Sequence, residues 1–306
     1  MVDRADLALV LAIREAASLA GAAKRLQITG AAVTKRLAHI EAALAVKLFV
    51  RTTRSVTITP EGEIFCESAR QIVSGFETLE SRISDFSTTP VGTIKLASNL
   101  GFGRQWVAPA LQAYSQHYPS VRVELHLLNR LPDLQAEGFD AAIWLWQPVP
   151  TQWIIHTLAR NTRVIVASPA YLKRAGEPVS LDDLRRHVCL LMQERDMPPN
   201  VWRLNRVVPQ DESASVVEVH VSGPLSSNNG EVLRDWALNG AGIALRPYWD
   251  VHSHIQNGRL VHVLSDYAKL DSDVQWIAPY RPHLPERVRL LRAFLEARLH
   301  DAQWLR

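Results

Sequence analysis

A group of cationic and hydroxyl-bearing side chains in the first sixty residues has the chemistry to hold DNA. Cations and hydroxyls bind phosphate oxygens, and on a helix they can also reach base edges in the major groove. In residues 30–44 the apolar positions recur at steps of four, three and four, which predicts a helix with a basic opposite face. The residues expected to contact DNA are Lys24, Arg25, Thr29, Ala31, Thr34, Lys35, Arg36, His39, Arg51 and Arg54.

Within this set, the side chains at the start of the basic helix are expected to enter the groove. The small residues around Ala31 allow a close approach, and Thr34, Lys35 and Arg36 follow, with Arg36 expected to read a base. Arg51 and Arg54 are expected to contact phosphates or the minor groove, and Lys24 and Arg25 are expected to contact the DNA backbone. The alternative is that these residues are ordinary solvated charges on a helical domain.

The elements that must position these residues are read from periodicity and caps. Helices are predicted over residues 3–17, 19–26 and 30–44, and Ser18 and Thr29 precede the second and third as N-caps. Two β-type runs, 47–51 and 55–59, flank Thr52–Arg54 and predict a hairpin with a basic tip. Residues 1–59 are therefore predicted to form a winged helix-turn-helix domain.

A long linker helix is predicted over residues 60–88. Thr59-Pro60-Glu61 is a strong helix start, because Thr can cap, Pro suits the first position and Glu favours the positive helix end. Apolar residues then recur at heptad spacing, at Phe65, Ala69, Ile72, Phe76, Leu79, Ile83 and Phe86. Such a seam favours pairing with a second copy; the alternative is a single helix packed on its own domain.

Residues 89–306 are predicted to form an α/β domain. Residues 87–92 contain Pro and Gly and indicate a hinge. Beyond them, strand-like runs at 93–98, 121–128, 141–145 and 164–167 alternate with helical runs at about 104–117, 132–137 and 170–175. This alternation is typical of a mostly parallel sheet covered by helices.

Polar residues next to two predicted helix starts form the candidate small-molecule site. Ligands of α/β domains bind where strand ends meet helix starts, and backbone N–H groups there suit an anion or a carbonyl. The alternative for Ser98 and Asn228 is plain N-capping. The residues expected to bind an effector are Ser98, Asn99, Leu100, Asn228 and Asn229, with Trp144, Trp146 and Arg246 as secondary candidates.

Composition and the remaining motifs exclude several classes of function. Residues 1–58 hold nine Lys/Arg and four Asp/Glu, a balance of +5, although the whole chain carries only +3. No apolar run is long enough to cross a membrane, and without an export signal we expect a cytoplasmic protein. Cys66 and Cys189 are too far apart in sequence to suggest a metal site, and His252-x-His254 is expected to be a surface pair. Catalytic and cofactor motifs are missing, so we expect neither an enzyme nor a cofactor.

Residues 18–62 resemble the LysR-type transcriptional regulators. The family pattern is matched by Ser18, Ala22-Ala23, Leu26, Thr29, Ile40-Glu41, Leu48-Phe49-Val50-Arg51 and Thr59-Pro60-Glu61-Gly62. In the C-terminal part, Gly92–Leu96, Tyr118-Pro119, Gly138–Ile143, Ala167–Leu172, Gly240–Ala244 and Gly258–Val261 are similar to the family's effector domain. The resemblance covers nearly the whole chain.

The resemblance implies a two-lobed effector domain of the periplasmic-binding-protein-like (type 2) fold. Lobe I would comprise about 92–164 and 267–306, and lobe II about 165–266. Two departures lie near the expected cleft. Arg246 stands where relatives often have an apolar residue, and Trp144-Leu145-Trp146 replaces a segment that often contains Arg and Gly. The effector chemistry of a typical member therefore does not transfer to this chain.

The implied function is regulation of transcription from double-stranded DNA. A dimer of such modules would read an inverted repeat, and the resemblance adds a tetramer, a small-molecule effector and, for an activator, RNA polymerase as a partner. Three alternatives stay open: an enzyme with a DNA-binding domain, a solute-binding protein, and an architectural DNA binder without ligand control.

Overall fold

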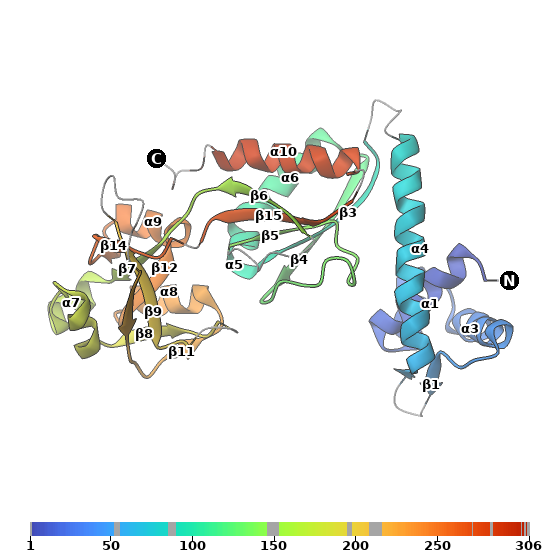
Figure 1. Ribbon diagram of the computed structural model, residues 1–306, viewed down its shortest axis with the longest axis horizontal. Helices are drawn as coiled ribbons and strands as arrows, with labels where there is room; N and C mark the ends of the chain where they lie inside the picture. The colour runs from blue at the N-terminus through green and yellow to red at the C-terminus, as the bar shows by residue number, and fades with distance from the viewer. Residues whose placement is uncertain are drawn as a thin grey trace. The chain divides into compact units, whose positions relative to one another are not determined.

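The computed structural model describes residues 2–51, 56–84, 90–145, 153–194, 198–207, 216–270, 272–281, 284–300, 302 and 304 (Figure 1). Residues up to Val91 make up most of one compact unit, and residues from Gly92 onward make up most of the other. We refer to them as the N-terminal unit and the C-terminal unit. Among the described residues, no helix is long and apolar enough to cross a membrane.

The N-terminal unit contains the predicted helices and the predicted hairpin. Its elements are α1 (Arg4–Ala16), α2 (Leu19–Leu26), α3 (Gly30–Leu44), β1 (Phe49–Arg51), β2 (Val56–Ile58) and α4 (Pro60–Ser84). The Ser18 hydroxyl accepts from the Gly21 amide at 3.0 Å and the Thr29 hydroxyl from the Ala32 amide at 3.2 Å. Both residues therefore act as the N-caps that the sequence predicted. The antiparallel pair β1–β2 forms the base of the wing.

The core of this unit joins the helix-turn-helix to the start of α4. Val33, Leu37 and Ile40 of α3 are fully buried and share one apolar cluster with Cys66 of α4. A side chain at Gly62 would overlap the carbonyl of Leu48, so the first turn of α4 can lie against the wing only with glycine there.

Glu41, at the end of α3, holds the start of the wing. Its buried carboxylate accepts hydrogen bonds from the Leu48 amide at 3.0 Å, the Phe49 amide at 3.2 Å and the Lys47 ammonium at 2.7 Å. Burial alone raises the pKa of Glu41, but the hydrogen bonds from Lys47 and the two amides outweigh it, and the pKa falls below its ordinary value. The carboxylate is therefore ionised at neutral pH.

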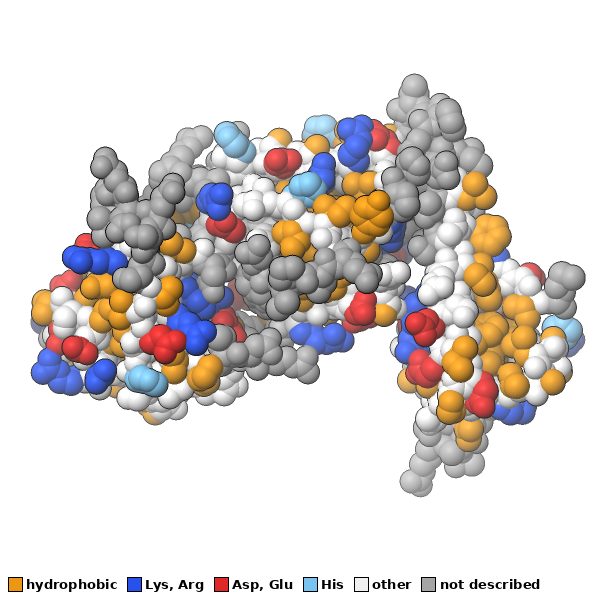
Figure 2. Space-filling view, viewed as in Figure 1, with side chains coloured by type: hydrophobic (Ala, Val, Ile, Leu, Met, Phe, Trp, Pro, Cys, Tyr) orange, Lys and Arg blue, Asp and Glu red, His pale blue; other side chains and the backbone are white. Residues whose placement is uncertain are grey.

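The apolar seam of α4 changes its surroundings along the helix. Cys66 and Ala69 are buried in the core of the N-terminal unit, whereas Ile72, Phe76 and Leu79 are 48%, 43% and 52% exposed. Figure 2 shows hydrophobic side chains along this helix and the helices beside it. The seam side chain of Ile83 and the whole of Phe86 lie outside the described residues.

The C-terminal unit contains two mixed sheets that define two lobes. Lobe I has the strand order β4-β3-β5-β15-β6. Its strands are β3 (Gly92–Asn99), β4 (Val121–Leu128), β5 (Ala141–Trp144), β6 (Trp153–Ala159) and β15 (Val274–Pro279). Its helices are α5 (Leu100–Phe102), a π-helical turn (Gly103–Val107), α6 (Ala108–His117) and α10 (Glu286–His300). The Tyr114 hydroxyl of α6 donates to the Arg287 carbonyl of α10 at 2.9 Å.

Lobe II has a five-stranded sheet of order β11-β8-β12-β7-β13 and a three-stranded sheet of order β10-β9-β14. The strands of the first sheet are β7 (Arg163–Ala167), β8 (Cys189–Met192), β11 (Ser226–Ser227), β12 (Ile243–Pro247) and β13 (Val261–His262). Those of the second are β9 (Val201–Arg206), β10 (Val216–His220) and β14 (Tyr267–Ala268). The helices are α7 (Pro169–Ala175), α8 (Gly230–Leu238), α9 (Tyr248–Gln256) and a 3₁₀ turn (Leu181–Arg186).

The chain crosses between the lobes twice, and the two crossings are hydrogen-bonded to each other. The Asn161 side chain donates to the Ser272 carbonyl at 3.1 Å, and the Asn161 amide donates to the Asp273 carboxylate at 2.9 Å. Nearby, the amides of Arg163 and Lys269 each donate to the other residue's carbonyl, at 2.8 and 2.9 Å. Two adjacent crossings give the lobes a narrow connection, which is the usual form of a hinge.

Three details differ from the sequence-based prediction. The sheets are mixed, because β15 runs antiparallel to β5 and β6, and β7 runs antiparallel to β12. Residues 134–138 form turns where a helix was predicted at 132–137. Strand β14, at residues 267–268, pairs with β9 and so belongs to lobe II, whereas the prediction began lobe I again at 267.

We predict that Glu41 decides whether the wing stays attached to α3. Glu41→Leu removes the acceptor for two buried amides and should cost about 2–4 kcal/mol of stability, while Glu41→Gln keeps an acceptor and should cost about 1 kcal/mol. Because the folded pKa is lowered, the charge contributes fully above the ordinary pKa of Glu, and its contribution is lost as the pH falls.

Hydrogen exchange of peptides covering residues 45–58 in the full chain measures this effect. Wild type and Glu41→Gln should differ at pH 7 and converge as the pH falls below about 4. Equal protection in wild type and Glu41→Leu at pH 7 would show that the carboxylate does not hold the wing.

Candidate DNA-contacting face and effector pocket

The face of α3 opposite the core is exposed and carries polar and cationic side chains. Val33, Leu37, Ile40 and Glu41 are the buried residues of this helix, and most of its other positions are exposed. Thr29 is the N-cap of α3, and the first residues of the helix after it are small. The predicted contacts that are exposed on or next to this helix are Thr29, Ala31, Thr34, Lys35 and His39.

Arg36 has a structural partner that the sequence-based prediction did not anticipate. Its guanidinium donates to the Asp6 carboxylate at 2.6 Å and to the Asp3 carboxylate at 2.9 Å. Burial tends to raise the pKa of Asp6, but the hydrogen bonds from Arg36 and from the backbone lower it overall. Arg36 therefore fastens α3 to α1, and its guanidinium is not directed to a base while these bonds are intact.

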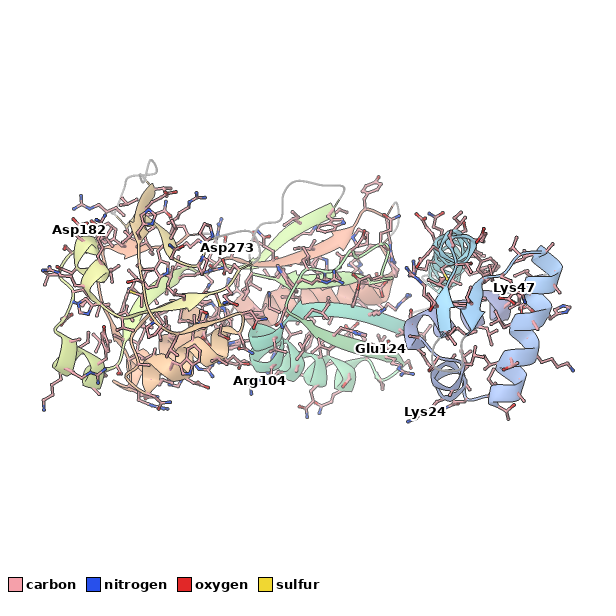
Figure 3. The ribbon with its side chains drawn as sticks, turned by 90° about the horizontal axis from the view of Figure 1, so that it is seen from below. Lys24, Lys47, Arg104, Glu124, Asp182 and Asp273 are labelled. Atoms are coloured by element: carbon pink, nitrogen blue, oxygen red, sulfur yellow. The ribbon has the colours of Figure 1, made fainter. Side chains whose placement is uncertain are left out.

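The other predicted phosphate contacts differ in how they are held. Lys24 is exposed at the end of α2, and Arg25 pairs with Glu15 at 2.7 Å (Figure 3). The backbone of Arg51 belongs to β1, but its side chain and the whole of Arg54 lie outside the described residues. Lys47, labelled in Figure 3, is bound to Glu41 and still 75% exposed, so its ammonium also faces solvent at the wing.

A large pocket lies between the two lobes of the C-terminal unit. Its volume is about 1160 Å³, and both lobes contribute to its wall. It is slightly larger than typical small-molecule sites, which have volumes of about 300–1,000 Å³. Five predicted effector residues line it, namely Asn99, Leu100, Asn228, Asn229 and Arg246.

On the lobe II side, the pocket wall is formed by the start of α8 and a buried arginine. The Asn229 side chain caps α8 by accepting from the Glu231 amide at 2.8 Å, so capping belongs to Asn229 and not to Asn228. A side chain at Gly230 would overlap the guanidinium of Arg246, which lies directly against this helix start. Arg246 donates to the Asp250 carboxylate at 2.8 and 3.0 Å.

On the lobe I side, the pocket wall contains polar groups that lack protein partners. Asn99 precedes α5 without a side-chain capping bond. Within the described part of the chain, Asn99 Oδ1 and the neighbouring Ser98 Oγ have no hydrogen-bond partner. Ser98 is fully buried behind the wall and does not line the pocket itself.

Trp144, the one predicted tryptophan that the structure describes, does not line the pocket. Trp144 is fully buried in the core of lobe I, packed with Ala97, Phe139 and Ile277, because β5 is covered on both faces. The proposed effector contact of Trp144 is therefore corrected to a core position. Trp146 lies outside the described residues.

Sequence reasoning missed other residues of the wall. Arg163, at the start of β7, and Trp249, in the first turn of α9, both line the pocket. Trp249 comes three residues after Arg246, so the departure from the family pattern at Arg246 was a signal that could have led to it. For Arg163 the sequence offered no signal, since a cation before an apolar strand is common.

The lobes touch each other beside the pocket. Arg104 of lobe I, labelled in Figure 3, forms an ion pair with Glu231 of lobe II. The rings of Phe102 and Trp249 meet edge to face with centroids 5.2 Å apart. An ion pair and an aromatic contact thus bridge the lobes at the start of α8.

Two other expectations concern cysteine and histidine. Burial raises the pKa of Cys66 to about 11 and that of Cys189 to about 12, so neither thiol ionises readily at neutral pH. His252 is buried, with Nδ1 3.1 Å from the Trp249 carbonyl, and is not the surface residue that we expected. It lies on the inner side of α9, where the apolar contacts of the helix bury it.

Comparison with known families identifies both parts of the chain. Residues 5–63 match the model of bacterial regulatory helix-turn-helix proteins of the lysR family, and residues 87–300 match that of the LysR substrate binding domain. The fold is that of a DNA-binding regulator with a ligand-binding domain. The chain belongs to the LysR family of transcriptional regulators, and it has the family's C-terminal effector-binding domain.

Individual relatives agree with this assignment. The chain is 40% identical to the HTH-type transcriptional regulator DmlR of Escherichia coli K12, over 86% of this chain and 83% of the relative. It is 38% identical to the HTH-type transcriptional activator TtdR of the same strain, with the same coverage. The full-length structure of the Vibrio cholerae virulence activator AphB is similar with a TM-score of 0.64 and 25% identity, covering 97% of this chain and 99% of that one.

We predict that the main role of Arg36 is to stabilise the N-terminal unit, and that recognition of a DNA base is secondary. Arg36→Met leaves the nearly buried carboxylate of Asp6 without its cation and should destabilise the N-terminal unit by about 1–2 kcal/mol. Lys35→Met, one residue away on the exposed face, is the control and should change stability by less than about 0.5 kcal/mol. Hydrogen exchange of α1 and α3 in the full chain measures both. Unchanged protection in Arg36→Met together with weaker DNA binding would restore the base-reading role.

Proposed function

We propose that the protein binds an inverted-repeat operator as a pair and that a small molecule in the pocket between the lobes modulates this activity. The exposed face of α3 carries the DNA part of the proposal. Thr34, Lys35 and His39 project from a helix whose other side is fixed in the core, which is the arrangement that a recognition helix needs in the major groove. Lys24 and the wing residues Arg51 and Arg54 would hold phosphates on either side.

The pairing surface that we propose is the exposed part of the α4 seam. Ile72, Phe76 and Leu79 follow one another on the same face of α4, and all three are exposed. A row of large apolar side chains on a surface favours burial against another apolar surface. The Arg4 guanidinium lies 5.6 Å from the ring centre of Phe76, so α1 borders this surface. A second copy offers the same stripe, and a pair would place two recognition helices on one DNA.

The effector part of the proposal rests on the pocket. The cavity of about 1160 Å³ is lined by both lobes and lies next to their narrow double connection. A small molecule in it can contact both lobes at once and so change their relative position. We further propose that the protein acts in the cytoplasm and that it contacts RNA polymerase at any promoter that it activates. The relative TtdR is named as an activator, and this supports the latter point.

An architectural DNA binder without ligand control remains the second candidate, because a basic helix face also suits non-specific binding. The pocket and the unpartnered polar group at Asn99 favour the regulator, since a purely architectural protein has no use for either. Gel shifts on the DNA flanking the protein's own gene, with competitor DNA at two salt concentrations, separate the two. If unrelated competitor DNA abolishes binding whatever the sequence of the probe, the architectural candidate is favoured.

We predict that Lys35→Ala weakens operator binding without affecting the fold. If Lys35 contacts a base, the binding free energy should fall by about 1–3 kcal/mol. If it contacts a phosphate, the slope of the logarithm of affinity against the logarithm of salt concentration should become smaller by about one. Fluorescence anisotropy with the operator at several salt concentrations distinguishes these two results. Lys173→Ala, an exposed lysine of α7, is the matched control and should bind like wild type. An unchanged affinity and slope in Lys35→Ala would remove this residue from the interface.

We predict that a charge in the α4 seam disrupts pairing. Phe76→Glu places a carboxylate in the surface that would be buried between two copies, so the dissociation constant of the pair should rise at least about tenfold. Ile64→Glu is the control, because Ile64 is an exposed apolar residue of the same helix that lies off the seam. Sedimentation velocity over a range of concentrations measures both variants. Identical association of Phe76→Glu and wild type would show that the chain pairs through another surface.

A further inference from the structure

We propose that Arg36 can contact a DNA phosphate and that Asp3, by holding the Arg36 guanidinium, weakens this contact. This inference rests on the proposed function, in which the exposed face of α3 lies in the major groove. It adds a contact within the protein that lowers the affinity for DNA of any sequence. Three observations support it: the place of Arg36 on α3, the unequal exposure of its two acidic partners, and the donors that those partners leave unused.

Arg36 lies at the border of the exposed face of α3, on the side next to α1. Ala32, Arg36 and His39 follow one another at steps of four and three, so they share one side of the helix. Lys35 and His39 are exposed, and His39 is near enough to Asp6 of α1 to interact with its charge. A DNA strand that follows the exposed face would therefore pass the side chain of Arg36.

The two acidic partners of Arg36 differ in how they are held. Asp6 accepts from Nε at 2.6 Å, and its side chain is only 6% exposed. Asp3 accepts from Nη2 through both carboxylate oxygens, at 2.9 and 3.0 Å, but its side chain is 64% exposed. An exposed ion pair contributes little to stability because water screens it. A phosphate can therefore replace Asp3 at little cost, while Asp6 still holds the guanidinium in place.

The guanidinium keeps donors that the two carboxylates do not use. Nε and Nη2 are bonded to Asp6 and Asp3, whereas Nη1 forms no hydrogen bond within the described part of the chain. The side chain is also partly exposed. A guanidinium presents five N–H donors in a planar fork that suits phosphate oxygens. A phosphate can thus be bound by Nη1 first, and by Nη2 as well once Asp3 is displaced.

The charge of Asp3 is separate from its structural role. Asp3 Oδ1 caps α1 by accepting from the Asp6 amide at 2.8 Å. This role needs an oxygen acceptor but no charge, because Asn and Ser are N-caps as good as Asp. The negative charge acts instead on Arg36, which it holds, and on DNA phosphates, which it repels. Both effects weaken the binding of DNA.

The experiment measures the affinity of the full-length protein for a duplex of unrelated sequence and for the operator, by fluorescence anisotropy at several salt concentrations. Asp3→Asn keeps the cap and removes the charge, so it should bind both duplexes at least about threefold more tightly, with a salt slope steeper by about one. The gain should be the same on both, because a phosphate contact carries no sequence information. Unchanged affinity would overturn the proposal, and a gain confined to the operator would overturn the assignment to phosphate.

Two further substitutions separate this effect from net charge. Glu67→Gln removes one negative charge from an exposed position of α4 and should bind DNA like wild type. Equal gains in Asp3→Asn and Glu67→Gln would contradict the proposal, because net charge would then be sufficient. Arg36→Gln removes the guanidinium, so adding Asp3→Asn to it should give no further gain. A full gain in the double variant would show that Arg36 is not the contact that Asp3 weakens.

Hydrogen exchange of α1 and α3 in the same preparations shows whether the fold is intact. Asp3→Ser supplies a second neutral cap and should give the same gain if Asn distorts the start of α1. If wild type does not prefer the operator to the unrelated duplex, the proposed function fails, while the unrelated duplex still decides the role of Asp3. If wild type prefers the operator but neither Asp3 variant gains affinity, this inference fails and the proposed function stands.

Discussion

The carboxylate of Asp250 is the interaction on which the arrangement of the pocket depends. It lies fully buried in α9 and accepts hydrogen bonds from Arg246 of β12 and Arg234 of α8. Two guanidinium groups could not be buried at this place without it, since an uncompensated charge inside a protein costs several kcal/mol. Because each of its partners belongs to a different element, one side chain fixes β12, α8 and α9 relative to one another. The Asp250 carboxylate thereby also fixes the start of α8 and the part of the pocket wall that it forms.

Glu41 has the corresponding role in the N-terminal unit. The amides of Ala45 and Val46 bond to carbonyls at the end of α3, whereas the buried amides of Leu48 and Phe49 need another acceptor. The buried carboxylate of Glu41 supplies it and is itself kept ionised by Lys47. In both units, therefore, a buried acid adds polar contacts to the apolar packing and joins elements that are separate in the sequence.

Much of this architecture could be predicted from the sequence, because it depends on local signals. Ser18 and Thr29 act as caps where their residue types and positions indicated, and the periodic apolar residues of α3 are the buried ones. The pocket residues next to helix starts were predicted for the same reason. A capping residue or a helical period involves only a few neighbours in the chain, so these predictions did not require the fold.

Two of the predictions that differed concern interactions between distant residues. Arg36 looked like a groove contact because its partners, Asp3 and Asp6, are thirty residues away and the sequence does not show that α1 brings them close. Trp144 looked like a ligand contact because the sequence does not show that β5 is a central strand covered on both faces. Tertiary packing decides which face of a strand is open and which charges meet, and periodicity alone cannot supply that information.

The two parts of the α4 seam imply how a pair would behave mechanically. Cys66 lies in the same apolar cluster as α3, Ala69 is also buried, and the Arg14–Glu63 ion pair at 2.6 Å ties α1 to this end of α4. Among the seam side chains that the structure describes, Ile72, Phe76 and Leu79 are the exposed ones and are open to a second copy. A pair formed there would carry each recognition helix on a rigid extension of the pairing surface. Any change in the angle between the paired helices would then change the spacing of the two recognition helices, and spacing is what an inverted repeat selects.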